Sequence, residues 1–229
     1  MTTRPILSAM ISKKSLFTTK ELSPETWSDF ARLFSQGNGW DHCWCIHFQR
    51  PRSLPKEQHL PTRIERSVRN CQQKKSLVDA GRAHGMLVYA ENEPVGWCQY
   101  GLREELPRID NSRNYRALSL KQGKSPKPKS THQKSTPEPH LWRITCFVVD
   151  KRYRRRGVAT AALKAVLASI KQQGGGIVEA HPITRWESRA FGNESTNGTY
   201  SMFKRQGFKT VASLGSTRFS THVLVRRFV

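Results

Sequence analysis

The segment of residues 144–170 constrains the fold of this chain more than any other. Its first part, 144–149, is apolar and rich in β-branched residues, which predicts a strand. Its last part, 159–170, is rich in alanine, leucine and lysine with apolar residues at helical spacing, which predicts a helix. A short basic turn that ends at Gly157 joins the two. Because glycine has no side chain, another group can approach the backbone closely there.

The basic turn predicts an anion site. It carries three consecutive arginines, Arg154, Arg155 and Arg156. The first amides of the helix that follows have no internal partners, and the helix dipole places partial positive charge there. A pyrophosphate is the anion that best suits such a site. Neither the phosphate-binding loop G-x-x-x-x-G-K-[ST] nor a G-x-G-x-x-G fingerprint after a strand is present, which excludes those two nucleotide-binding motifs.

The turn resembles the acyl-CoA-binding motif of the GNAT N-acetyltransferase superfamily, [RQ]-x-x-G-x-[GA], which reads R-R-R-G-V-A at residues 154–159. Residues 94–97, P-V-G-W, are similar to a strand that GNAT sequences often carry before this motif. Gly207 and Phe208 are similar to the pair that ends a short helix in that family. The resemblance implies an α/β (α+β) GNAT fold: a central mixed, mostly antiparallel sheet of about six to seven strands flanked by helices.

The elements predicted along the chain follow the order of that family. They are a strand at 17–22, a helix from Pro24 to Gly37, a helix at 62–80, hairpin strands at 86–90 and 95–100, the motif strand and helix, a strand at 177–181, a short helix at 200–206, and closing strands at 208–212 and 221–226. We predict one GNAT domain over residues 1–229. Residues 111–140 are predicted to be a basic, mobile insertion, because 121–139 have almost no apolar residues to bury.

The resemblance implies an N-acetyltransferase that uses acetyl-CoA as co-substrate and acetylates an amine acceptor of unknown identity by direct attack in a ternary complex. The motif strand would pair with the pantetheine arm, its amides would stabilise the oxyanion, and the turn and first helical amides would bind the pyrophosphate. The cofactor-binding residues predicted in this way are Phe147, Val148, Val149, Arg154, Arg155, Arg156, Gly157, Val158, Ala159 and Thr160.

Several residues are candidates for the general base. Many family members carry a glutamate on the motif strand at the position of Thr145, which cannot serve at neutral pH. Glu179 on the following strand is the first catalytic candidate, directly or through water, and His181 on the same face is the second. Glu104 and Glu105 are further options. The alternative role for Glu179 is that of a structural partner for a nearby arginine.

The general acid also departs from the family pattern. The usual tyrosine, four residues before the glycine of the Gly–Phe pair, is Phe203 here. Tyr200 lies nearly one helical turn earlier on a similar face and is the catalytic candidate that would replace it. Packing in the core is the alternative role for Tyr200.

The charge of the chain is strongly positive, with 39 Lys+Arg against 17 Asp+Glu and a formal net charge of +22. Acetyl-CoA accounts for only a few of these charges, so a polyanionic partner such as nucleic acid or a ribosome is a further possibility beside a basic, soluble surface. The alternative function is a catalytically weak GNAT-fold protein that binds CoA or such a polyanion. The positive charge disfavours free polyamines as acceptors.

The five cysteines form no disulfide framework, which predicts reduced thiols and a cytoplasmic location. No apolar run is long enough to span a membrane, and no secretory signal is recognisable, so no membrane partner is expected. If residues 40–48 formed a strand, Cys43, Cys45 and His47 would share one face. No second Cys/His cluster completes a metal site. This aromatic segment is therefore expected to line the acceptor pocket or to pack in the core.

Overall fold

The computed structural model describes residues 16–37, 40–50, 62–112, 115–116, 139–186, 194–216 and 220–229. Its strands and main helices, in chain order, are β1 (Thr18–Glu21), α1 (Trp27–Ser35), α2 (Arg63–Asp79), β2 (His84–Ala90), β3 (Glu93–Leu102), β4 (Leu141–Val149), α4 (Val158–Gln172), β5 (Ile177–Ala180), β6 (Ile183–Trp186), α5 (Tyr200–Arg205), β7 (Lys209–Ser216) and β8 (Ser220–Phe228).

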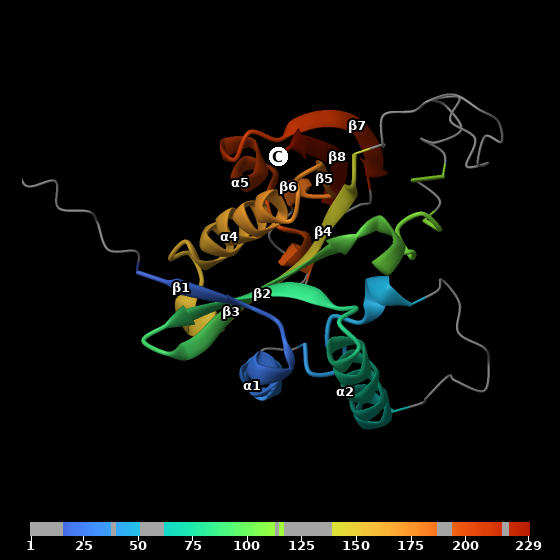
Figure 1. Ribbon diagram of the computed structural model, residues 1–229. Helices are drawn as coiled ribbons and strands as arrows, with labels where there is room; N and C mark the ends of the chain where they lie inside the picture. Colours follow the sequence, from blue (N-terminus) through green and yellow to red (C-terminus); the bar gives the residue numbers. More distant parts are fainter. Residues whose placement is uncertain are drawn as a thin grey trace, which may run out of the picture.

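The described strands form one eight-stranded sheet in the order β1-β2-β3-β4-β5-β8-β6, with β7 paired to β8. Of these pairs, β4–β5 is parallel and the others are antiparallel. Helices α1 and α2 cover one face of the sheet, and α4 and α5 lie on the other (Figure 1). The predicted mixed, mostly antiparallel sheet flanked by helices is confirmed. The strand count is higher than expected because β6 was not predicted.

The predicted hairpin is formed by β2 and β3 through a tight turn. Its two central residues, Glu91 and Asn92, both have positive φ, 49° and 71°. Two successive left-handed residues give a turn whose twist matches that of paired strands. Gly96 of β3 lies under the start of α4, where a Cβ would come 2.3 Å from Val158 Cγ1. A glycine at this position therefore lets α4 lie directly on the sheet.

The two faces of the sheet are buried in different ways. The face under α4 is aliphatic, with Leu163 and Val166 of α4 packed over Ile144 of β4. The opposite face is aromatic: Phe30 of α1 lies 4.8 Å from Trp97 of β3, measured between ring centroids. Both faces exclude water from the central strands, and this burial supplies the main stabilising free energy of the fold.

Helix α2 matches the predicted helix at residues 62–80. Thr62 caps it: the Thr62 side chain accepts from the Glu65 amide, and the Glu65 carboxylate accepts from the Thr62 amide at 3.0 Å. Its apolar residues Ile64 and Val68 do not face the core, since they are 76% and 53% exposed.

The buried face of α2 instead carries Asn70, Lys74 and Val78, which follow one another at a spacing of four. Lys74 points inward because its ammonium donates to Gln49 Oε1 at 2.7 Å. It also lies over the rings of Phe30 and Trp97.

Residues 40–50 form a turn and a short 3-10 helix, His47–Gln49, where a strand had been considered. Trp44 and Cys45 adopt left-handed φ values of 49° and 44°, so the residue alternation of a strand is not realised. Trp44 and Cys45 are buried under the sheet, while His47 and Phe48 reach a cavity described below. In the part of the chain that the structure describes, no group of three or more His, Cys, Asp or Glu side chains is arranged to hold a metal ion.

The predicted insertion, residues 111–140, lies largely outside the described residues. Its first part is packed against the domain: Tyr115 is 7% exposed, and its hydroxyl donates to Glu179. The limits predicted for the insertion stay a prediction, and Tyr115 is a buried residue within them. The loop at 51–61 also lies outside the described residues.

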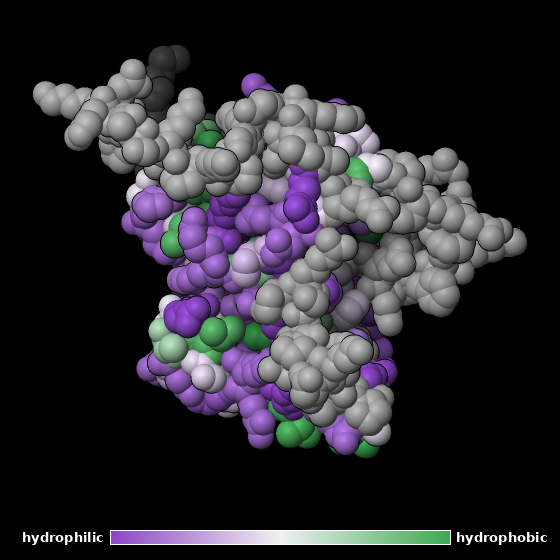
Figure 2. Space-filling model, turned by 90° about the vertical axis from the view of Figure 1, so that its right-hand side faces the viewer, coloured by the Kyte–Doolittle hydropathy of each residue, from purple (hydrophilic) through white to green (hydrophobic). Residues whose placement is uncertain are grey.

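On the face shown in Figure 2, the described surface is mainly hydrophilic, with scattered apolar patches. None of the described helices has both the length and the apolar character needed to cross a membrane.

Candidate functional site

Strands β4 and β5 separate halfway along β4. They pair from Leu141↔Ile177 to Ile144↔Ala180, where β5 ends, while β4 continues to Val149 along β3. Beyond Ile144, the backbone of β4 therefore has no paired strand on the β5 side among the described residues. An extended ligand can pair with such an edge in the manner of an added strand.

A β-bulge lies at the point of separation. Gln99 of β3 pairs with Cys146 and Tyr100 pairs with Ile144, so Thr145 is the extra residue on β4. The Thr145 hydroxyl is buried and donates to Gln99 Oε1 at 3.0 Å. It is therefore held by β3 and serves as a structural group at the position where a glutamate is usual in the family.

The turn after β4 is built on Asp150, which is 3% exposed. Its carboxylate accepts from the Arg152 amide at 2.8 Å and from the Arg152 guanidinium. The hydrogen bond from Arg152 lowers the pKa of Asp150 below its usual range, so the pair is ionic at neutral pH. Arg152 also binds Glu93 at 2.7 Å, so its charge is compensated.

The three arginines that follow are exposed, and none of them forms an ion pair with another described residue: Arg154, Arg155 and Arg156. Arg155 has φ 63° and Gly157 has φ 90°, which turns the chain sharply into α4. A Cβ built at Gly157 meets no atom within 4 Å, so the turn borders open space.

Uncompensated cations, open space and the N-terminus of a 15-residue helix thus meet at the predicted anion site. Val158, in contrast, is 2% exposed and packs in the core, so at this position the backbone amide rather than the side chain is available to a ligand.

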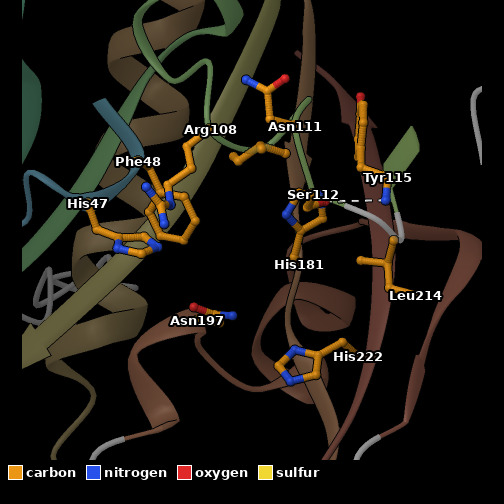
Figure 3. Close-up of a pocket in the computed structure, with 11 residues that line it drawn as sticks. His47, Phe48, Arg108, Asn111, Ser112, Tyr115, His181, Asn197, Leu214 and His222 are labelled. Carbon is orange, nitrogen blue, oxygen red and sulfur yellow. Dashed lines mark hydrogen bonds between the residues drawn. The ribbon is translucent and has the colours of Figure 1, made fainter. Parts of the chain in front are cut away.

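A cavity of about 440 Å³ opens where β4 and β5 separate, because His181, in its wall, directly follows the last paired residue of β5. Its described lining is His47, Phe48, Arg108, Ile109, Asn111, Ser112, Tyr115, His181, Asn197, Leu214 and His222. In Figure 3, His47, Phe48 and Arg108 lie on one side, and Tyr115 and Leu214 lie on the opposite side. Part of the 40–48 segment packs in the core, as expected, and His47 and Phe48 line this cavity; that the cavity is the acceptor pocket stays a prediction.

Glu179 lies behind the cavity wall and is fully buried. Its carboxylate accepts from Arg226 Nε at 2.9 Å, from the Tyr115 hydroxyl at 3.2 Å and from Arg143 Nε at 3.4 Å. Arg143 is itself buried and also donates to Asp110 at 2.7 Å. Both oxygens of Glu179 are thus occupied by cations or a phenol, an arrangement typical of a structural ionic network.

His181 lies between this network and the cavity. Its Nε2 is buried, 3.8 Å from Glu179 Oε1, and forms no hydrogen bond with a described residue. Burial lowers the pKa of His181 to about 4; the charge of Glu179 opposes this, and that of Arg143 adds to it. The imidazole is therefore neutral at pH 7 and keeps an unprotonated nitrogen.

Glu104 and Glu105 are not among the described residues that line the cavity. Glu105 lies 2.8 Å from His84 Nδ1 and accepts from the Leu102 amide at 3.1 Å. Its hydrogen bond raises the pKa of His84. Glu105 therefore closes the end of β3 and has a structural role there.

Tyr200 and Phe203 face different neighbours on α5. The Tyr200 hydroxyl accepts from Thr210 Oγ1 at 3.0 Å, which leaves its own proton available for donation. Phe203 is fully buried, with its ring 6.0 Å from Phe147 of β4. The position where the family carries a tyrosine is therefore filled by an apolar ring that packs against the motif strand.

Several lining residues were missed by sequence reasoning. Arg108, Asn111, Ser112, Tyr115, Asn197, Leu214 and His222 come from separate segments of the chain. They lie on several loops and on β7 and β8, so no sequence spacing links them. Tyr115 carried the one usable signal, as an aromatic residue at the edge of a polar stretch.

The family model described as Acetyltransferase (GNAT) family matches residues 40–185. Among solved structures, a putative acetyltransferase of the GNAT family from Desulfovibrio desulfuricans is 13% identical, with TM-score 0.47, over 93% of this chain and 98% of that chain. NAA60 of Arabidopsis thaliana in complex with acetyl-CoA is 17% identical, with TM-score 0.45, over 93% and 99%. The yncA protein of Salmonella typhimurium with acetyl-CoA is 10% identical, with TM-score 0.47, over 93% and 94%. No curated protein sequence matches the chain.

Proposed function

Because the chain belongs to the acetyltransferase (GNAT) family, we propose that it transfers the acetyl group of acetyl-CoA to an amine bound in the cavity beside His181. The observation that carries this proposal is the separation of β4 and β5 after Ile144 and Ala180. The part of β4 without a partner on the β5 side runs towards the basic turn at residues 154–157, and His181, which lines the cavity, directly follows Ala180, so one extended ligand along β4 would reach both.

Acetyl-CoA supplies a thioester carbonyl that reacts with a neutral amine. The open turn fits its pyrophosphate, since Arg154, Arg155 and Arg156 lack carboxylate partners among the described residues. The amides of Val158, Ala159 and Thr160 would complete that site, with Gly157 leaving room for it. The backbone of residues 147–149 would hold the pantetheine arm, and the bulge at Thr145 sets where that pairing begins.

We assign the proton-accepting role to His181. Once the amine nitrogen bonds to the carbonyl, its N–H becomes strongly acidic, so even a base of low pKa can remove the proton. The neutral imidazole is available for this throughout the neutral pH range. Glu179 would act as a positioning residue, because its charge 3.8 Å away favours the protonated ring. The prediction that Glu179 itself is the base stays a separate prediction, tested below.

Tyr200 remains the proposed proton donor to the leaving thiolate. Its hydroxyl accepts from Thr210 Oγ1, so its own proton is free to be donated. Tyr200 also follows Asn197, a lining residue of the cavity, by three positions.

The residues that line the cavity also limit the charge of the acceptor. No carboxylate is found among the described lining residues, whereas Arg108 contributes a cation. A polycationic acceptor would meet repulsion without a compensating acid. We therefore propose a primary amine whose remaining groups are neutral or anionic. The five free cysteines suit a reducing compartment, and the cytoplasm is the proposed location.

The test is acceptor-dependent release of CoA, measured by chromatography. The acceptors are glycine and phenylalanine, whose amines carry a carboxylate, phenylethylamine, which is neutral apart from its amine, and spermidine, a polycation. We expect release with one or more of the first three and none with spermidine. His181→Gln should lower kcat by about 10²-fold while leaving the Kd for CoA unchanged.

Two results would contradict the proposal. Release that no amine increases, together with intact CoA binding, would favour a GNAT-fold binding protein. Release with spermidine alone would overturn the assigned acceptor class.

A further inference from the structure

Two cysteine thiols meet under the sheet, on the side of α1 and α2. Cys45 belongs to the 40–50 turn and Cys146 to β4, and their sulfurs lie 3.2 Å apart in hydrogen-bond contact. Both are free and nearly buried, at 3% and 7% exposed. A disulfide has a sulfur–sulfur length of about 2.05 Å, so an approach of about 1.1 Å separates this contact from a covalent bond.

Lys74 of α2 places a buried positive charge beside this pair. It is fully buried, and its ammonium forms no ion pair with a carboxylate among the described residues. Burial lowers its pKa to about 8, while the neighbouring thiols, Cys45 first, act in the opposite direction. A buried ammonium without a counter-ion is costly, so a thiolate nearby is favoured.

Of the thiols around Lys74, Cys45 is the one that the site favours as a thiolate. Burial alone would raise the pKa of Cys45, but the hydrogen bond with Cys146 and the charge of Lys74 lower it. The pKa of Cys43 is raised to about 11, mainly by burial. That of Cys146 is also raised, first by its hydrogen bond with Cys45 and then by burial. A thiolate next to a second thiol is a pair that a two-electron oxidant can convert into a disulfide.

We propose that Cys45 and Cys146 form a redox modification site, in which a hydroperoxide converts the two thiols into a disulfide that joins the 40–50 turn to β4. The Cys45 sulfur attacks the peroxide oxygen, the O–O bond breaks, and one water leaves with a proton from the site. Cys146 then attacks the resulting sulfenic acid, the S–S bond forms, and a second water leaves. Two thiols and one hydrogen peroxide thus give one disulfide and two waters.

The disulfide would restrict the movement of one wall of the cavity. His47 and Phe48, two and three residues after Cys45, form one of its walls, and Cys146 follows the bulge at Thr145. Drawing the turn towards β4 would fix this wall. Joining residues 101 positions apart would also restrict the unfolded chain. The site therefore goes beyond the proposed function and is tested without an acceptor.

The test is a count of free thiols after treatment of the full chain with hydrogen peroxide. In denaturant, we expect the five thiols of the untreated protein to fall to three. Non-reducing peptide mapping should find Cys45 linked to Cys146. The melting temperature should rise on oxidation and return on reduction with dithiothreitol. Cys45→Ser and Cys146→Ser should each abolish the linked peptide, while Cys71→Ser, which changes a thiol outside the pair, should leave it unchanged.

Lys74→Met tests the role of the buried charge and removes an uncompensated ammonium while keeping an unbranched side chain. It should slow formation of the disulfide about tenfold, in line with a smaller thiolate fraction. Five thiols retained by the parent protein, or thiols lost without a Cys45–Cys146 peptide, would overturn the proposal. An unchanged oxidation rate in folded Lys74→Met would remove Lys74 from it.

Discussion

Replacing Gly157 with glutamate should separate the binding of CoA from the stability of the fold. Gly157 has φ 90° and ψ 3°, a left-handed conformation that costs an L-residue about 1–2 kcal/mol. A Cβ there meets no atom within 4 Å, so no steric cost is added. Since about 1 kcal/mol corresponds to about 2–4 °C for a chain of this size, the melting temperature should fall by only a few degrees.

The effect on binding should be much larger. The glutamate side chain would project into the open space at the α4 N-terminus and compete there with the pyrophosphate for the arginines and amides. Charge-assisted hydrogen bonds contribute about 1.5–3 kcal/mol each, so the loss of two costs about 3 kcal/mol or more. That corresponds to an increase in the Kd for CoA of about 10²-fold or more. Titration calorimetry with CoA, beside thermal unfolding, measures both quantities.

Gly174→Glu is the matched control. Gly174 also has positive φ, 97°, and a Cβ there also meets no atom within 4 Å, but it lies beyond the other end of α4. It should destabilise the fold at least as much, because an acid is unfavourable near a helix C-terminus, and leave CoA binding intact. Gly157→Ala separates backbone strain from charge. If folded Gly157→Glu binds CoA as tightly as the parent protein, the anion site has been wrongly placed.

Three further predictions concern the cavity wall and α5. Glu179→Gln removes the buried carboxylate that pairs with Arg143 and Arg226 and leaves Asp110 as the ion-pair partner of Arg143, so the free energy of unfolding in urea should fall by about 3 kcal/mol; a stable variant that has lost only kcat would instead support Glu179 as the base. The folded pKa of His181, about 4, lies below its unfolded value of 6.5, so the unfolded state binds more protons between these values. Stability should therefore fall by about 3 kcal/mol from pH 6.5 to 4, and His181→Gln should flatten this dependence in urea titrations at several pH values. Tyr200→Phe should lower kcat about 10²-fold without changing the Kd for CoA, and an unchanged kcat would exclude Tyr200 as the acid.

The elements that carry the proposed donor site could be predicted because their signals are local. Strand β4, the basic turn and α4 are consecutive, and each is determined by its own composition and by Gly157. The hairpin of β2 and β3 could also be predicted, because its turn residues, Glu91 and Asn92, are polar and separate two apolar runs. Where the family pattern is broken, at Thr145 and Phe203, the structure shows apolar or hydrogen-bonded packing, which no motif predicts.

Other parts depend on tertiary contacts and could not be predicted. Strand β6 has four residues and directly follows Pro182, too short a run for a recognisable alternation. In α2, a lysine ordinarily faces water; Lys74 is buried because Gln49 and two aromatic rings, distant in sequence, surround it. The left-handed positions in the 40–50 turn are occupied by Trp44 and Cys45 rather than by glycine, so the sequence gives no signal of a turn there.

The dispersed origin of the cavity bears on how such a chain can diverge. In the proposed function, one continuous stretch of chain would bind the donor, so a change in that stretch would affect the whole donor site. The residues that line the cavity, where the acceptor would bind, come from separate segments, and each segment can be replaced while the others stay in place. Chimaeras that swap the turn at 40–50 or the segment at 106–116 should thus retain the donor and acquire new acceptors, which makes selectivity modular in evolution and in the laboratory.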